Sequence, residues 1–121
     1  AVYDSGKYGW TRDLKKIRKT FESQLSMLHT DYTDMGFVHC IDEVSDYEKI
    51  MSGGIWDYMK SLKENGVIRH LGLSSHDPEI IRRFLDTALI DMVMFSINPA
   101  YDYSTGDYGI GTASECEDVA F

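Results

Sequence analysis

The fold of this chain is decided by residues 62–79, which read LKENGVIRHLGLSSHDPE. An amphipathic helix over residues 55–62 leads into Gly66, a residue suited to the position just after a helix, where positive φ is required. Residues 67–73, VIRHLGL, predict a strand. Asp77, as N-cap, and Pro78, at the first helical position, then begin another helix. This stretch therefore predicts one complete strand-to-helix unit.

The same alternation continues on both sides of this stretch. Residues 35–40 (MGFVHC) and 90–97 (IDMVMFSI) are short apolar runs without helical phasing, as in strands buried on both faces of a parallel sheet. Residues 42–53 are polar and predict a long loop or a short helix. Near the start, Thr11 is the expected N-cap of a helix whose apolar residues recur every three or four positions: Leu14, Ile17, Phe21, Leu25 and Leu28.

Alternating helices and strands at this spacing predict an α/β fold with a parallel sheet. Three strands cannot close a (β/α)8 barrel, which has eight strands and needs about 250 residues. We therefore predict either a small open sheet or part of something larger. Residues 1–121 are expected to form one partial domain with loop-like ends at 1–10 and 104–121. The methionines expected to fill the core are Met27, Met59, Met92 and Met94.

Composition excludes several classes of function. The net charge is −8 and basic residues form no stripe, so we expect neither a nucleic-acid partner nor attraction to an anionic membrane. No apolar run reaches the roughly 18 residues of a membrane-spanning helix. Cys40 and Cys116 lie far apart without a CxxC pair, which favours the reducing cytoplasm over a disulfide-linked scaffold.

Polar residues follow each predicted strand at the end where parallel α/β folds gather their functional groups. They are His39, the run Ser74-Ser75-His76, and Asn98. A lone histidine at a strand end is more often structural than catalytic, and His76 fits a cofactor contact or a capping role equally well. His39 with Cys40, Asp42 and Glu43 suggests metal ligands, but neighbours on a strand point to opposite faces, so we expect no metal site.

Two longer motifs carry a resemblance to a known family. Residues 31–39, DYTDMGFVH, and residues 62–74, LKENGVIRHLGLS, resemble segments of the aldo-keto reductases, in the same order and at similar spacing. Residues 90–93 and 98–99 resemble that family's next strand and its end. The match runs from about residue 11 to residue 103, and the run Ser74-Ser75-His76 resembles bacterial members that carry a ferredoxin-like tail. It implies the central part of a (β/α)8 barrel, with about three βα units.

The resemblance also implies chemistry. Such enzymes transfer hydride between NADPH or NADH and a small aldehyde or ketone. His39 corresponds to the histidine of the catalytic tetrad, a donor that orients and polarises the substrate carbonyl. Ser74, Ser75 and Asn98 correspond to cofactor-binding positions, although Ser75 stands where the family often has asparagine. Met94 stands about where many members have a glutamine that binds the nicotinamide carboxamide.

The tetrad's aspartate, tyrosine and lysine would precede residue 1, and we assign none of these roles to Lys7. We therefore expect the isolated chain to lack reductase activity. The alternative is a non-catalytic half-barrel that self-associates or binds a partner through exposed sheet edges. A flavodoxin-like binding domain is disfavoured, because the sequence contains no phosphate-binding loop.

Overall fold

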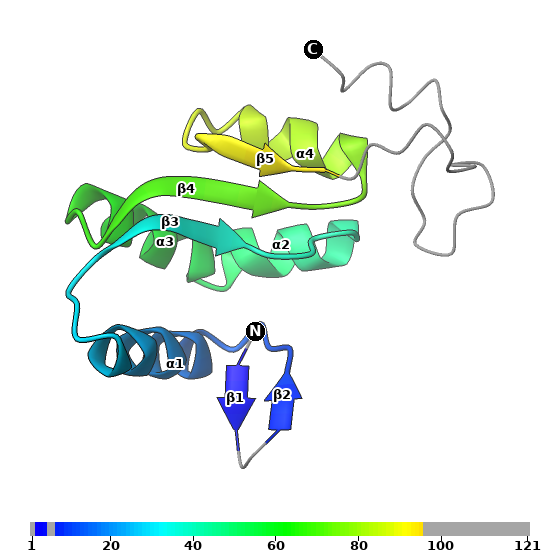
Figure 1. Ribbon diagram of the computed structural model, residues 1–121. Helices are drawn as coiled ribbons and strands as arrows, with labels where there is room; N and C mark the ends of the chain where they lie inside the picture. Colours follow the sequence, from blue (N-terminus) through cyan, green and yellow to red (C-terminus); the bar gives the residue numbers. More distant parts are fainter. Residues whose placement is uncertain (1, 5–6, 96–121) are drawn as a thin grey trace, which may run out of the picture. The chain divides into compact units, whose positions relative to one another are not determined.

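Three parallel strands form the sheet that carries the candidate site. In the computed structural model they lie in the order β3-β4-β5, and their arrows point the same way in Figure 1. Strand β4 pairs in parallel with β5, so that Gly72 lies opposite Met92 and Ser74 opposite Met94. The predicted α/β class with parallel strands is confirmed.

The structure describes residues 2–4 and 7–95. The elements, in chain order, are β1 (Val2–Asp4), β2 (Lys7–Gly9), α1 (Leu14–Met27), β3 (Thr33–Val38), α2 (Val44–Ser52), α3 (Ile55–Glu64), β4 (Ile68–Ser74), α4 (Pro78–Leu85) and β5 (Met92–Met94).

The beginning of the chain differs from the prediction. Residues 1–10 were expected to form a loop, but β1 and β2 pair there as antiparallel strands, with Val2 opposite Gly9. Strands of three residues are too short to display the alternation of apolar and polar residues by which a strand is recognised. The valine and tyrosines of this segment do favour extended structure. The loop expected at residues 104–121 lies outside the described residues.

The N-cap of α1 is Asp13 rather than the predicted Thr11. The Asp13 carboxylate accepts a hydrogen bond of 2.9 Å from the backbone N–H of Lys16, which satisfies one unpaired amide of the first turn. The Thr11 hydroxyl instead accepts from the Asp13 backbone N–H at 3.1 Å. The aspartate lies closer to the helix, so it takes the capping position and leaves the threonine outside.

The predicted methionine core is correct only for Met59, which is 9% exposed in α3. Met27 is 76% exposed, Met92 40% and Met94 55%. Met27 is the last residue of α1, a helix without a fully buried residue, and the other two lie in β5. Met92 and Met94 are two residues apart on β5, so they project from the same face of the strand, and that face is exposed in the described part of the chain.

The chain folds as two compact units. The first unit consists of Ala1–Gly36 and Ser45–His70, and its buried apolar side chains come mainly from α3. An ion pair of 3.0 Å joins Arg12, before α1, to Asp46 in α2. Gly66 has the positive φ (71°) predicted for it after α3. The buried apolar residues of this unit are Ile50, Ile55, Trp56, Tyr58, Met59, Leu62 and Ile68.

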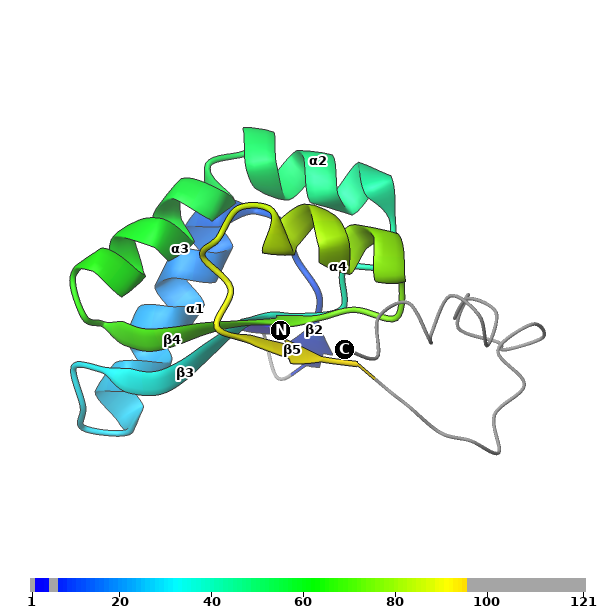
Figure 2. The same ribbon diagram turned by 90° about the horizontal axis from the view of Figure 1, so that it is seen from above.

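The second unit consists of Phe37–Val44 and Leu71–Phe121. It contains the ends of β3 and β4 together with α4 and β5. Helix α4 begins as predicted, because the Asp77 carboxylate accepts from the backbone N–H groups of Glu79 (2.8 Å) and Ile80 (3.3 Å). In Figure 2, α4 lies on one side of β4 and β5. The buried apolar residues of this unit are Val38, Ile41, Leu71, Leu73, Ile80, Ile81 and Phe84.

Among residues 2–4 and 7–95, none of the helices combines the length and the apolar character needed to cross a bilayer.

Candidate functional site

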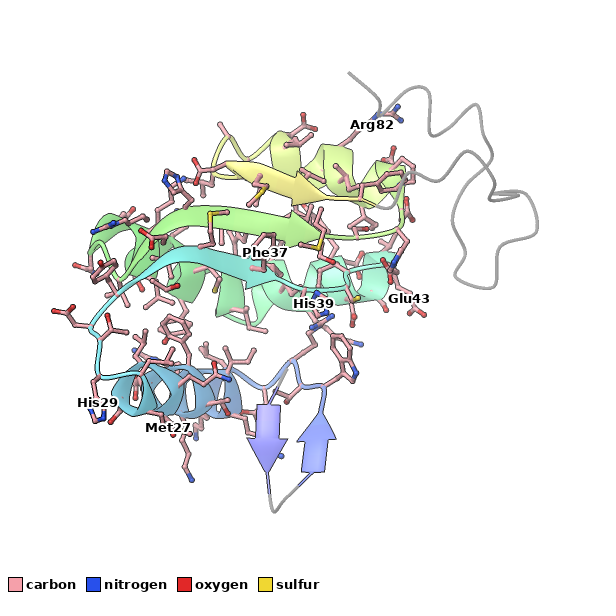
Figure 3. All side chains as sticks on the ribbon, in the orientation of Figure 1. Met27, His29, Phe37, His39, Glu43 and Arg82 are labelled. Carbon is pink, nitrogen blue, oxygen red and sulfur yellow. The ribbon has the colours of Figure 1, made fainter. Side chains whose placement is uncertain are left out.

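His39 is the first residue beyond β3, and its side chain is exposed. Figure 3 shows it just past the arrowhead of that strand. Its Nε2 lies 3.8 Å from the Sγ of Cys40. Cys40 itself has a positive φ of 49°, so the backbone turns sharply directly after the histidine. An exposed imidazole at the carboxyl end of a parallel strand is well placed to meet a ligand.

Ser74 and Ser75 end the neighbouring strand. Ser74 is the last residue of β4 and is 6% exposed, and Ser75 follows at 1%. The Ser74 carbonyl accepts from the Ile41 backbone N–H at 3.0 Å. The Ser75 hydroxyl donates to the Ile41 carbonyl at 2.5 Å and accepts from the Asp77 backbone N–H at 3.0 Å. Both serines therefore help to hold the segment after β3 against the segment after β4.

Asp42 and His76 make a second link between the same two segments. One oxygen of Asp42, Oδ1, accepts from the backbone N–H of His76 at 2.7 Å. The other, Oδ2, lies 3.1 Å from the Nδ1 of the His76 ring. Both side chains are partly exposed, at 34% and 28% respectively. Sequence reasoning missed this pair, because its members are 34 residues apart and meet only when β3 and β4 are neighbours.

The remaining predicted positions are those after β5. Asn98 lies outside the described residues. Met94, which stands where a carboxamide-binding glutamine was expected, is the last residue of β5 and is 55% exposed. Its carbonyl accepts from the Ser75 backbone N–H at 3.4 Å. The sheet therefore brings His39, Ser74, Ser75 and Met94 to the carboxyl ends of three adjacent strands, all within the second unit.

Three side chains in the segments after β3 and β4 offer metal-binding atoms that lie close together. The ligand atoms of Cys40, Asp42 and His76 all lie within 4.8 Å of one another. Sequence reasoning grouped Cys40 and Asp42 only with their immediate neighbours, so it did not identify His76 as a third ligand. Glu43, which the sequence also suggested as a ligand, is exposed and is not part of this group.

Comparison with known proteins finds a matching family and two similar proteins. The profile of the aldo/keto reductase family matches residues 5–101. A curated relative, the "Uncharacterized oxidoreductase YqkF" of Bacillus subtilis (strain 168), is 28% identical over 98 residues, which is 79% of this chain and 30% of that protein.

A solved structure, the "aldo-keto reductase AKR11C1 from Bacillus halodurans (holo form)", matches with a TM-score of 0.59 and 27% identity. The match covers 79% of this chain and 31% of that one. This chain thus spans about a third of the length of both relatives. The predicted partial (β/α)8 barrel is confirmed. Because the family profile covers most of the sequence, the chain belongs to the aldo/keto reductase family.

Proposed function

We propose that the protein is an oxidoreductase that transfers hydride between NADPH or NADH and a small aldehyde or ketone, with His39 as a carbonyl-orienting donor. The observation that carries this proposal is the exposed imidazole of His39 directly after β3, next to the serines that end β4. Family membership supports the reaction class.

The residues after β4 fit part of a nicotinamide. Ser74 offers a short uncharged hydroxyl at the carboxyl end of the strand, which suits hydrogen bonding to a carboxamide. Ser75 is 1% exposed and its hydroxyl proton points to the Ile41 carbonyl, so a carboxamide contact there requires that bond to break. We therefore assign the contact to Ser74 and give Ser75 the role of holding the segment that carries His39. A contact from Asn98 stays a prediction.

The cofactor, when bound, supplies the hydride that attacks the carbonyl carbon. The part of His39 is to donate an imidazole N–H to the carbonyl oxygen, which polarises the C=O bond and fixes its orientation as negative charge develops on oxygen. The proton that completes the alcohol comes from the family's tyrosine, which we expect outside residues 1–121. For the same reason we expect the isolated chain to be inactive.

Kinetics on the protein that contains this segment test the proposal. NAD(P)H oxidation is followed with a panel of aldehydes and ketones, and His39→Ala should lower kcat about 100-fold or more, as expected when a preorganised donor is lost. His29→Asn is the matched control, because His29 is an exposed histidine outside the site whose φ of 53° asparagine tolerates. Absence of turnover with every carbonyl rejects the reductase, and normal turnover by His39→Ala rejects the role of His39.

A second candidate function is the self-associating half-barrel. The observation in its favour is the exposure of Met92 and Met94 on β5, the strand that ends the order β3-β4-β5 in the described part of the chain. The occupant of this edge would be a second copy of residues 1–121. Light scattering over a range of concentrations should then show a mass that rises with concentration and returns to the monomer in Met94→Lys. A folded monomer at all concentrations counts against it.

A further inference from the structure

We propose that Cys40, Asp42 and His76 bind a divalent transition-metal ion such as Zn²⁺. The three side chains offer a thiol sulfur, a carboxylate oxygen and an imidazole nitrogen, all within 4.8 Å of one another. This mixture of one soft, one borderline and one hard ligand favours Zn²⁺ or Co²⁺ over Mg²⁺ and Ca²⁺, which prefer oxygen alone. Three protein ligands leave one tetrahedral position for water.

The backbone holds the three ligands in place from two sides. Cys40 and Asp42 flank Ile41, which is fully buried and bonded to Ser74 and Ser75 through its N–H (3.0 Å) and its carbonyl (2.5 Å). The third ligand, His76, comes next in the chain after these serines. These bonds fasten the two segments to each other between the ligands, so the backbone that carries the three ligands is held in place.

Asp42 already has the arrangement of a ligand oriented by its surroundings. Its Oδ1 accepts from the His76 backbone N–H at 2.7 Å, which leaves Oδ2 directed at the imidazole, 3.1 Å from Nδ1. Metal-ligating carboxylates are commonly held in this way by a hydrogen bond to the other oxygen. An ion can therefore bind between Oδ2 and Nδ1 while the amide bond stays, with the imidazole in the tautomer that carries its proton on Nε2.

The distances suit zinc after a small movement. Zinc bonds of about 2.0 Å to oxygen and nitrogen and about 2.3 Å to sulfur place ligand atoms roughly 3.3 to 3.6 Å apart in a tetrahedron. The Asp42–His76 pair is already near this separation, and the sulfur, which lies within 4.8 Å of both other atoms, has to approach by at most about 1.5 Å. Partial exposure of Asp42 (34%) and His76 (28%) gives the ion a path from solvent. Binding deprotonates the Cys40 thiol, and the proton goes to the buffer.

Cobalt titration of the full chain, reduced and kept free of oxygen, tests the proposal. The wild-type protein should take up one Co²⁺ per site with a thiolate-to-cobalt charge-transfer band, and Zn²⁺ but not Mg²⁺ should abolish the band. Cys40→Ser should lose the band. Asp42→Asn and His76→Asn should weaken binding about tenfold or more. Cys116→Ser is the matched control, because it removes the other cysteine of the sequence and should leave the band unchanged.

A second substitution of Cys40 shows whether the band is lost because the ligand is missing or because the protein no longer folds. Cys40→Asn suits the left-handed backbone at this position (φ 49°), so it should keep the wild-type circular dichroism while losing the band. Zn²⁺ should raise the melting temperature of the wild type and not that of Cys40→Asn. A wild type without the band, a band that survives in both Cys40 variants, or a band lost in Cys116→Ser overturns the proposal. These readouts do not involve NAD(P)H, so they are independent of the reductase assay.

Discussion

At the scale of single residues, the sheet depends on a glycine in β4. An added Cβ at Gly72 would meet the ring of Phe37 at the end of β3, 2.7 Å from Cδ1 and 2.8 Å from Cζ. These separations are well below van der Waals contact, so the glycine is what permits the aromatic ring to lie across the neighbouring strand. Phe37 is half-buried, so its ring can move only in part.

We expect Gly72→Ala to destabilise the protein by about 1–3 kcal/mol, the usual cost of overpacking. The free energy of unfolding in urea measures this. Gly9→Ala is the control, because an added Cβ there meets nothing within 4 Å, and its effect should stay within about 0.5 kcal/mol. Adding Phe37→Leu to Gly72→Ala should recover part of the loss. Strictly additive effects of the two substitutions would contradict the clash.

Tyr58, in α3, is the residue whose titration bears on stability. Burial raises the pKa of its phenol, and the negative charge of Glu22 raises it further. The guanidinium of Arg18, 4.8 Å from the ring centroid, opposes both. Since the folded-state pKa lies above the ordinary value of 10.0, the stability linked to Tyr58 is complete below pH 10.0 and is lost as the pH rises through the folded pKa.

We therefore expect wild type to lose stability faster than Tyr58→Phe as the pH is raised above about 10, because the variant has no phenol to ionise. Urea midpoints measured from neutral to strongly alkaline pH give this difference. Glu22→Gln should make the difference in pH dependence between the protein and its Tyr58→Phe variant smaller, because Glu22 raises the pKa of Tyr58. Arg18→Met should make this difference larger, because Arg18 lowers that pKa. The assignment of this pH dependence to Tyr58 would be rejected if the urea midpoints of wild type and Tyr58→Phe changed in parallel with pH. It would also be rejected if Glu22→Gln enlarged the difference and Arg18→Met reduced it.

At the scale of elements, local sequence signals predict most helices and strands. Asp77 with Pro78 begins α4, Gly66 follows α3, and the three apolar runs became β3, β4 and β5. These signals predict structure correctly because each one depends only on residues a few positions apart: a helix cap, a turn residue or a periodic run of apolar residues. The β1–β2 pair was missed because three-residue strands carry too little pattern.

The two capped helices offer a test at this scale. Asp77→Ala removes the hydrogen bonds to Glu79 and Ile80 and should cost about 1 kcal/mol, while Asp77→Ser should keep most of the stability. Asp13→Ala, the corresponding change in α1, should lower the stability by less, because α1 contains no fully buried residue that fraying of the helix would expose. Thermal melting of the three variants measures this order. An equal loss for Asp77→Ala and Asp77→Ser would show that the side chain does not act as a cap.

At the scale of the whole molecule, burial is distributed unevenly. Ile68, Leu71 and Leu73 of β4 are fully buried, whereas the apolar face of α1 is only half-buried. Segments with few buried apolar contacts open at lower free energy than core segments. The stability of the chain is therefore concentrated around β4.

Native-state hydrogen exchange should show this gradient. We expect the Leu71 amide, which donates to the Asp91 carboxylate at 2.8 Å, to exchange only through nearly global unfolding. Amides in the middle of α1 should exchange at a lower free energy. Asp91→Ala should accelerate exchange at Leu71 and leave α1 unchanged. Equal protection of α1 and β4 would mean that α1 is stabilised by more than its own half-buried face.

The sequence by itself determined the order of α1, β3, α3, β4, α4 and β5, the parallel sheet and the position of His39 at a strand end, because these follow from short-range periodicity and from two family-like motifs. Only the tertiary structure decided which strand ends meet. The bonds from Ser75 to Ile41 and from Asp42 to His76 join residues 34 apart. Such contacts exist only once β3 and β4 lie side by side, since neither segment contains a local signal for the other. The grouping of Cys40, Asp42 and His76 belongs to this second class.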